Sequence, residues 1–364
     1  MTDNLKRYRA IMNGLKQLYP GQMSARRMQH MRVLAALING IVGGGKSQLP
    51  AIANKMPGGG QRESRITRLR RWLKNDKITI ANYFAPFAEL LLAGLAHQPL
   101  VLVIDGSQIG RGCMCLMVSV VYKKRALPLG WLVFQGTKGH CTEARHLEVL
   151  EQVKTLIPEG AEVIILGDGE FDGVDWLKSV SDYGWFYVCR TAKNTILYEE
   201  DERFSFSQWG IEPGQCLSLS NICFTEQQYA SLMAIAWWDA SYKEPIYLVT
   251  NLELAEEACF YYRKRFQIET FFSDQKSRGF HLHKSHLSDP KRLARLLIAT
   301  CLAYIWMIYL GALTIQRPHW LKAIHRVDRC DLGLFQLGLT LLEHFLTDNL
   351  PILVAFQVPS PQGC

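Results

Sequence analysis

The segment YRKRFQIETFFSDQK, residues 262–276, contains a phenol, two bases and an acid that are spaced at helical intervals. The segment contains no Gly or Pro, so we expect it to form a helix. Since each helical residue advances about 100°, one narrow stripe of this helix would hold Tyr262, Arg265, Glu269 and Lys276. A carboxylate flanked by bases could hold a divalent metal ion with phosphates on either side. Ordinary ion pairs on a solvated face would show the same spacing, so the metal interpretation requires further acids elsewhere in the chain.

Two such acids follow apolar segments that are typical of buried strands. PLVLVID ends in Asp105, and VIILGD ends in Asp168. Open α/β sheets collect their ligands at the carboxyl ends of strands, which is where both carboxylates are expected. The sequence DGEFD also offers Glu170 and Asp172, but we prefer Asp168 because it follows the strand directly. Oxygen ligands without His or Cys favour Mg²⁺ or Mn²⁺ over zinc.

The elements around these acids indicate an α/β fold. Between residues 99 and 190 the pattern is strand, antiparallel hairpin, helix, strand, helix and strand, the order of a layered α/β domain. Residues 191–251 contain short β-like runs broken by Gly, Pro and Asn, so we expect a β-rich insertion there. The helix that carries Glu269 is expected to begin at Leu254, and residues 318–364 are expected to form further helices with a polar tail.

The N-terminal region is strongly basic. Residues 1–76 contain 15 Lys or Arg against three acids, so they hold the whole excess of positive charge in a chain whose net charge is +8. Helical spacing indicates two helices over residues 4–42 and a short basic helix in RESRITRLRRWLKN. This last helix carries Arg62, Arg65, Arg68, Arg70, Arg71 and Lys74. A helix, a turn and a basic helix together indicate a DNA-reading module, although a solvated basic face would have the same composition.

Length and composition indicate a folded chain of two or three domains. The chain has 364 residues, of which 48% are hydrophobic and 20% charged. The ten cysteines form no CxxC pair, which argues against a structural zinc site. The N-terminus is polar and basic and does not resemble a signal peptide. Together these two observations favour reduced thiols in the cytoplasm.

One apolar stretch could suggest a membrane. Between Arg295 and Arg317 lie 21 residues without a formal charge, enough to cross a bilayer. A helix covered on all sides by other elements has the same pattern, and polar residues such as Thr300 and Tyr304 interrupt the run. We therefore expect a buried helix and no membrane partner.

The main alternative to a metal-dependent site is a phosphate-binding loop. Residues 40–47, GIVGGGKS, fit the GxxxxGK[ST] pattern, and Asp105 could then serve a nucleotide hydrolase. That loop must follow a β-strand, whereas the preceding RRMQHMRVLAALIN has helical spacing, so we expect a loop between helices. A DNA-binding regulator without catalytic activity is a third possibility.

A second cluster of possible metal ligands occurs in KGHCTEARH, where His140 and His146 flank Glu143. Their spacing places the two histidines on different helical faces. We therefore expect capping or surface roles for them rather than metal binding.

Taken together, three acids on two strand ends and one helix, with a β-rich insertion before the helix, resemble the RNase H-like core of the DDE transposases. The Tyr-x2-Arg-x3-Glu-x6-Lys pattern of residues 262–276 is similar to the YREK signature of the insertion-sequence-four group of bacterial transposases. The resemblance covers about residues 99–310. It implies that two Mg²⁺ or Mn²⁺ ions in each active site are held by Asp105, Asp168 and Glu269. It also implies that the phosphates of a transposon end are held by Tyr262, Arg265 and Lys276.

The resemblance implies an activity and its partners as well. The expected activity is DNA strand cleavage and strand transfer by a cut-and-paste route, acting on terminal inverted repeats and target DNA. Two ends must be cut and joined, so we expect a homodimer in the DNA complex. In the resembled group an aromatic side chain of the insertion stacks on a flipped base, and the candidates here are Trp237, Trp238 and Tyr247.

These considerations predict five regions. In chain order they are a helical DNA-binding domain (1–95), the first part of an RNase H-like catalytic core (96–190), a β-rich insertion (191–251), the second part of the core (252–315) and a C-terminal helical region (316–364).

Overall fold

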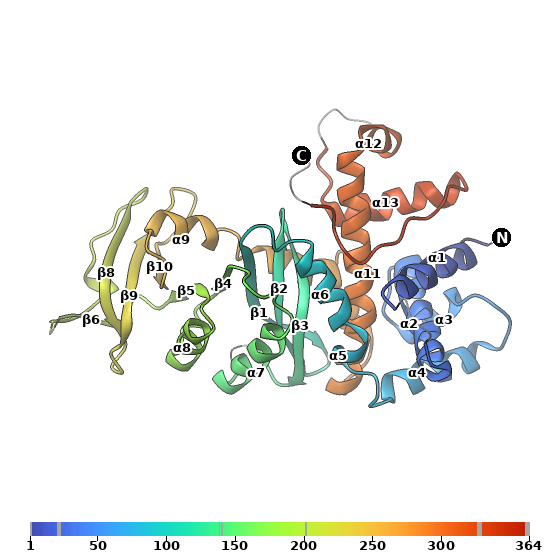
Figure 1. The fold of residues 1–364 in the computed structure, drawn as a ribbon, viewed down its shortest axis with the longest axis horizontal. Coiled ribbons are helices and arrows are strands. Elements are labelled where there is room, and N and C mark those ends of the chain that lie inside the picture. The colour runs from blue at the N-terminus through green and yellow to red at the C-terminus, as the bar shows by residue number, and fades with distance from the viewer. Residues whose placement is uncertain are drawn as a thin grey trace.

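A single large β-sheet runs through the molecule, with most helices gathered toward one end of it (Figure 1). The computed structural model describes residues 2–19, 23–137, 139, 141–200, 202–325 and 330–360. Within them the ten strands follow the order β3-β2-β1-β4-β5-β10-β9-β8-β6-β7. The fold is therefore mixed α/β, consistent with the RNase H-like architecture that was expected.

Helices make up the N-terminal region, as the apolar periodicity predicts. They are α1 (Asp3–Gln17), α2 (Ala25–Gly44), α3 (Leu49–Lys55), α4 (Arg62–Lys74), α5 (Ile80–Tyr83) and α6 (Ala85–Ala93). The start of α2 is capped by Ser24, whose side chain accepts a hydrogen bond from the backbone N–H of Arg27. Its end is marked by Gly45 in the left-handed conformation, with φ 58°.

The central part of the sheet comes from the next segment. Its elements are β1 (Leu100–Gly110), β2 (Cys113–Tyr122), β3 (Arg125–Gln135), α7 (Glu143–Lys154), β4 (Val163–Gly167), α8 (Val174–Asp182) and β5 (Phe186–Thr191). Strands β1, β2 and β3 pair antiparallel in sequence order, and β4 pairs in parallel with both β1 and β5. The predicted hairpin and the predicted α/β order are both confirmed.

The predicted β-rich segment extends this same sheet rather than forming a separate one. Its elements are β6 (Ile196–Glu199), β7 (Glu202–Ser205), the 3₁₀ helix η1 (Phe206–Gln208), β8 (Cys216–Phe224), β9 (Tyr229–Trp237) and β10 (Ile246–Thr250). Strand β10 pairs antiparallel with β5, and β9 continues from β10. A backbone ladder therefore joins the insertion to the core.

The last part of the chain is helical again. It comprises α9 (Ala255–Tyr262), α10 (Gln267–Gln275), the 3₁₀ helix η2 (Leu282–Lys284), α11 (Pro290–Gln316), α12 (Pro318–Ile324) and α13 (Leu334–Thr347).

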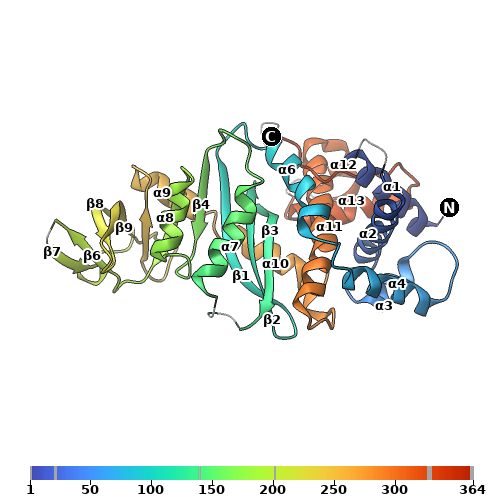
Figure 2. The ribbon, with the colours of Figure 1, turned by 60° about the horizontal axis from the view of Figure 1, so that its bottom comes forward.

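Figure 2 shows α7 and α8 in front of the sheet and α10 behind it. The two faces of β3 contact helices on opposite sides of the sheet. Trp131 donates to the carbonyl of Ala294 in α11 at 3.2 Å, whereas a Cβ on the neighbouring Gly130 would lie 3.0 Å from Val153 of α7, and successive strand residues face opposite sides.

The expectation of one continuous helix through residues 262–276 is wrong. Helix α9 ends at Tyr262 and α10 begins at Gln267. Between them the hydrogen bonds tighten to the i to i+3 pattern, as in Arg265 N–H to Tyr262 O at 3.0 Å and Glu269 N–H to Phe266 O at 3.2 Å. The chain bends because α9 packs against β5 and β9, whereas α10 packs against β1 and β3.

Helix α11 is the apolar stretch that could have suggested a membrane. It is long and apolar enough to span a bilayer by length and composition, and 94% of its most apolar window is buried inside the protein. It packs against α13, β3, α2 and α4. The expected buried helix is confirmed, and it joins the N-terminal helices to the sheet.

Two glycines allow α11 and α13 to approach closely. A Cβ on Gly311 would lie 1.9 Å from the carbonyl oxygen of Leu334, and a Cβ on Gly338 would lie 1.9 Å from that of Met307. In both cases the atom in the way is backbone, which cannot rotate aside.

We expect Gly311→Ala and Gly338→Ala each to lower the free energy of unfolding by roughly 1–3 kcal/mol, the usual cost of overpacking. Alanine is intrinsically the better helix former, so any loss reports the close packing of α11 on α13. Urea unfolding of the full chain measures it. Gly94→Ala is the matched control, because its Cβ would meet only carbonyl oxygens at 3.5 and 3.6 Å. Equal stability of Gly311→Ala and Gly94→Ala would contradict the close approach.

Candidate active site

Three acids from distant parts of the chain lie on one pocket. Asp105, Asp168 and Glu269 line a cavity of about 540 Å³. The other residues that line it are Gly106, Ser107, Arg265, Phe272, Ser273, Lys276 and Ser277. The lining contains neither His nor Cys. Converging carboxylates without nitrogen or sulfur ligands fit a hard divalent cation such as Mg²⁺.

Asp105 lies within β1 and not at its end, which corrects the sequence expectation. The strand continues to Gly110 because β2 pairs with it well beyond Asp105, which is opposite Met117. The parallel pairing with β4 reaches only Val103. Asp105 therefore lies just past the stretch that β1 and β4 share. The residue is only 8% exposed, and its Oδ1 accepts from Gly106 N–H at 2.7 Å.

Asp168 follows β4 directly, as predicted, and a tight turn holds it. Its Oδ1 accepts from the backbone N–H of Glu170 at 3.0 Å, and its carbonyl accepts from Phe171 N–H, also at 3.0 Å. The other acids of DGEFD are placed differently. Asp172 accepts from the Thr191 hydroxyl at 2.6 Å, and burial raises its pKa. Of the three acids, only Asp168 lines the pocket.

Glu269 is held by a buried base. Arg265 donates to its Oε1 at 2.9 Å, and the two side chains are 8% and 54% exposed respectively. Burial opposes the charge of Arg265, but Tyr262 and Glu269 nearby raise its pKa above the usual value, so the guanidinium stays charged. Its Nε is buried and has no hydrogen-bond partner among the described residues. A buried charge beside three carboxylates offsets part of their mutual repulsion.

Lys276 points back toward β1. Its Nζ donates to the hydroxyl of Ser107 at 2.6 Å. Sequence reasoning missed Ser107, although it lies two residues after Asp105, the spacing that puts two strand side chains on one face. Tyr262, in contrast, is 1% exposed and does not line the pocket. Burial raises its pKa to about 12, so its ring belongs to the core beside the site.

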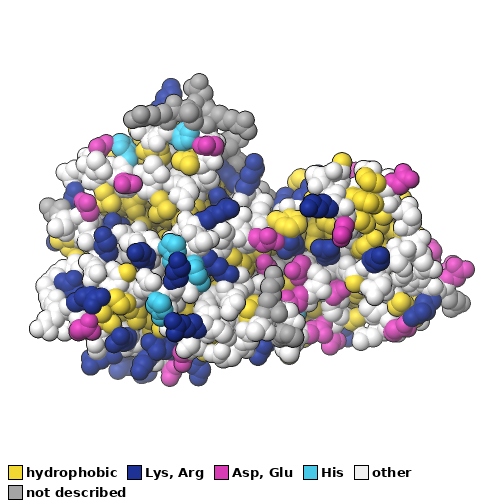
Figure 3. Space-filling view, turned by 180° about the vertical axis from the view of Figure 1, so that it is seen from behind, with side chains coloured by type: hydrophobic (Ala, Val, Ile, Leu, Met, Phe, Trp, Pro, Cys, Tyr) yellow, Lys and Arg dark blue, Asp and Glu magenta, His cyan; other side chains and the backbone are white. Residues whose placement is uncertain are grey.

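The predicted basic helix forms, as α4, but its side chains are not equivalent. Figure 3 shows Lys and Arg side chains gathered over the N-terminal helices. Arg65 is half-buried and donates to backbone carbonyls, including that of Met56 at 3.0 Å. Arg62 is exposed but donates to Asn54 at 3.1 Å. The other basic side chains of the helix are exposed, namely Arg68, Arg70, Arg71 and Lys74.

The phosphate-loop pattern lies between two helices, as expected. Residues 40–44 complete α2, and α3 begins at Leu49. The hydroxyl of Ser47 is buried and donates to the carbonyl of Phe280 at 2.8 Å. A side chain used in this way cannot reach a nucleotide-bound metal ion. The structure therefore offers no support for the nucleotide hydrolase.

The three insertion aromatics are mostly occupied by packing. Trp237 is 5% exposed, with the guanidinium of Arg263 4.9 Å from its ring centroid. Trp238 is half-buried and donates to the carbonyl of Tyr242 at 3.1 Å. Tyr247 is half-buried against Phe206, with ring centroids 5.1 Å apart.

An aromatic that sequence reasoning overlooked is next to Arg265, which lines the pocket. Phe266 is 42% exposed, and the guanidinium of Arg265 lies 4.2 Å from its ring centroid. The sequence offered one signal for Phe266, namely that it directly follows the candidate site residue Arg265.

The expected surface or capping role of His146 is wrong, whereas His140 lies outside the described residues. His146 is 3% exposed. Its ring packs against both Phe171 and Trp176, with centroids 4.6 and 6.1 Å away. Burial lowers its pKa to about 4, so the imidazole is neutral at pH 7. Local spacing could not show this, because Phe171 and Trp176 come from the segment after β4.

A comparison with protein families agrees with this geometry. A family model described as "Transposase DDE domain" matches residues 97–306, more than half of the chain and all three acids of the pocket. Among solved structures, the chain is similar to the piggyBac transposase synaptic complex with hairpin DNA. The TM-score is 0.47 at 12% identity, covering 100% of this chain and 88% of that chain. A search of curated proteins gives no match.

Because the pocket is lined by carboxylates, we expect the full chain to bind Mn²⁺ and Asp105→Asn or Asp168→Asn to weaken that binding by at least about tenfold. Electron paramagnetic resonance of free Mn²⁺ measures it. Asp172→Asn is the matched control, since it lies outside the pocket and an amide oxygen can still accept from Thr191. If Asp172→Asn lost the ion and Asp168→Asn kept it, the second acid would be wrongly assigned.

Proposed function

Because the chain belongs to the Transposase DDE domain family, we propose that it binds the ends of a transposon and cuts and joins DNA at the pocket of Asp105, Asp168 and Glu269. The chain is a transposase, a metal-dependent enzyme that cleaves DNA. The observation that carries the assignment of the site is the convergence of carboxylates from β1, the β4 turn and α10 on one pocket.

The three carboxylates are proposed to hold two Mg²⁺ or Mn²⁺ ions. When bound, such ions would activate the attacking oxygen and stabilise the leaving oxygen of an in-line phosphoryl displacement. The protein side chains supply the rest. The turn at residues 168–171 orients the Asp168 carboxylate, and Arg265 and Lys276 provide positive charge for DNA phosphates that the acids would repel.

The subgroup, route and assembly are part of the same proposal. The YREK pattern supports membership of the insertion-sequence-four group, and three of its four residues, Arg265, Glu269 and Lys276, line the pocket. Buried Tyr262 would then act through its neighbour Arg265 rather than contact a phosphate directly. We propose a cut-and-paste route on terminal inverted repeats, with a homodimer that holds two ends.

The N-terminal helices are proposed to hold the DNA end through the exposed bases of α4. A buried contact ties this helix to the core. Arg295 of α11 donates to the carbonyl of Leu73 at 2.8 Å and to that of Ile78 at 3.1 Å, and it pairs with Asp76. DNA bound on α4 would therefore be held in a set position relative to α11 and the sheet. This anchoring favours tests on the full chain over tests on a fragment.

We expect Asp105→Asn and Glu269→Gln to reduce metal-dependent nicking of end-labelled transposon DNA by more than about 100-fold. Removing a residue that only hydrogen-bonds to a metal ligand lowers activity by about 10–100-fold, and removing the ligand itself should lower it further. DNA binding in a gel shift should remain. Asp182→Asn at the exposed end of α8 is the control acid. Near-normal nicking by both pocket variants would remove the basis for this site.

Replacing Arg68, Arg70 and Arg71 together by Ala should weaken DNA binding at all sequences and flatten its salt dependence. The slope should fall by about 0.9 for each DNA phosphate that the variant no longer neutralises. Gel-shift titrations at several salt concentrations measure it. Lys178→Ala on α8 is the control base, exposed but outside α4. Arg265→Ala should instead impair cleavage more than binding. An unchanged slope in the triple variant would exclude α4 as the DNA-binding helix.

A further inference from the structure

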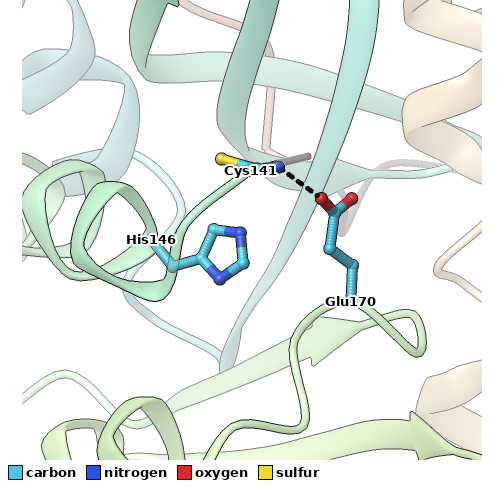
Figure 4. A group of neighbouring side chains, drawn as sticks. All are labelled: Cys141, His146 and Glu170. Carbon is cyan, nitrogen blue, oxygen red and sulfur yellow. Dashed lines mark hydrogen bonds between the residues drawn. The ribbon is translucent and has the colours of Figure 1, made fainter. Parts of the chain in front are cut away.

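A second group of metal-binding side chains lies beside the turn that holds Asp168, separate from the residues that line the catalytic pocket. The Sγ of Cys141, a ring nitrogen of His146 and a carboxylate oxygen of Glu170 all lie within 4.8 Å of one another. Figure 4 shows the three residues close together, with the Glu170 carboxylate directed at the backbone N–H of Cys141. Cys141 precedes α7, His146 belongs to α7, and Glu170 lies in the turn after β4. Two segments of the chain, the start of α7 and the turn after β4, therefore contribute to one point.

The imidazole of His146 is the feature that the remaining fold does not explain. The residue is 3% exposed, and its Nε2 is buried with no hydrogen-bond partner among the described residues. A buried polar atom left unpaired costs about 1–3 kcal/mol, and such atoms are rare in folded proteins. In Figure 4 the ring edge with this nitrogen faces Cys141 and Glu170. The rings of Phe171 and Trp176 hold it in that orientation.

The thiol of Cys141 has only a weak partner at this point, and Glu170 is drawn toward the same segment. Cys141 Sγ has a long contact of 3.9 Å to the carbonyl of Thr142. One carboxylate oxygen of Glu170 accepts from Cys141 N–H at 3.3 Å, which draws the carboxylate toward the cysteine. A carboxylate has several lone pairs, so this bond leaves room for a further ligand.

We propose that Cys141, His146 and Glu170 bind a Zn²⁺ ion at a site distinct from the catalytic pocket. One thiolate, one imidazole and one carboxylate are the ligand types that zinc accepts. Sulfur and nitrogen ligands discriminate against Mg²⁺, which the oxygen-lined catalytic pocket favours. Metal–ligand bonds of about 2.0–2.3 Å place tetrahedral ligands roughly 3.5 Å apart. The side chains would thus close by about 1 Å from their widest present separation.

Binding requires Cys141 to lose its proton to solvent, so each ion bound releases one proton from the thiol. The three protein ligands leave the fourth tetrahedral position open to water. The absence of a CxxC pair had argued against a structural zinc site. That argument concerns ligands that are close in sequence, whereas Glu170 comes from a different segment.

The position of the site suggests what the ion would do. Glu170 N–H donates to Asp168 Oδ1 at 3.0 Å, so an ion on the Glu170 carboxylate would restrain the turn that orients a catalytic acid. A Cβ on Gly106, next to Asp105, would also lie 4.0 Å from Glu170 Oε2. Glu170 is therefore a positioning residue between the two sites. This consequence rests on the proposed function, whereas zinc binding itself does not.

Cobalt titration of the metal-free full chain tests the proposal without any activity assay. Tetrahedral Co²⁺ with a thiolate ligand gives visible bands and a near-ultraviolet thiolate-to-metal band. We expect one equivalent of Co²⁺ to produce both, and Zn²⁺ but not excess Mg²⁺ to remove them. Cys141→Ser should lose the near-ultraviolet band, and His146→Gln should weaken binding by at least about tenfold.

Two controls separate this site from others in the chain. Cys223→Ser, at another half-buried free cysteine, should keep the band, and so should Asp105→Asn, which alters only the catalytic pocket. In the unmutated chain, zinc should slow alkylation of Cys141 by a thiol reagent, read by mass spectrometry, so the test does not depend on the folding of any variant. The proposal is overturned if the unmutated chain gives no band, if the band survives Cys141→Ser, or if zinc leaves alkylation of Cys141 unchanged.

Discussion

Three carboxylates that face one pocket repel one another, and the arrangement around Arg265 is what makes their approach tolerable. Its guanidinium is buried, bonded to Glu269 and raised in pKa by its neighbours. Lys276, directly after α10, adds a second positive charge and is oriented by Ser107. The acids therefore carry built-in counter-charges before any cation binds. The same charges suit the phosphates of DNA, whose backbone the acids alone would exclude.

The bend between α9 and α10 helps to place these charges. A straight helix through residues 262–276 would have to cover two parts of the sheet at once. Instead the chain tightens at residues 263–266, so that α9 lies against β5 and β9 while α10 lies against β1 and β3. The bend leaves Tyr262 in the core and brings Arg265 and Glu269 to the pocket.

Helix α11 connects the proposed DNA-binding region to the chemistry. It meets β3 through Trp131, α4 through Arg295, and α13 through the close approach at Gly311 and Gly338. The two proposed metal sites share one structural element, because the turn after β4 contributes Asp168 to one and Glu170 to the other. Their ligand chemistries differ, oxygen alone in one and sulfur, nitrogen and oxygen in the other, so the two proposed sites would favour different ions.

Much of the secondary structure could be predicted from the sequence. Apolar runs such as those before Asp105 and Asp168 form buried strands because their residues are covered on both faces. The 3.6-residue period of apolar residues is sufficient to predict α2 and α4. The uncharged run of α11 was predicted as a buried helix from its polar interruptions. The acids of the candidate site were also named from the sequence, and the structure brings them to one pocket, while their catalytic role stays a proposal.

Other properties depended on contacts between segments that a local pattern does not contain. Arg65 looks like its neighbours in the basic helix, but carbonyls near the end of α3 take up its donors. His146 looks like a surface residue until Phe171 and Trp176 bury it. The three acids of DGEFD are chemically alike, and only the turn after β4 directs Asp168 to the pocket, Asp172 to Thr191 and Glu170 to Cys141. The sequence by itself identified the three candidate acids and most of the helices and strands, since both follow from residue type and short-range period. The tertiary structure decided which side chains meet, because burial and charge partners come from parts of the chain that are far apart in sequence.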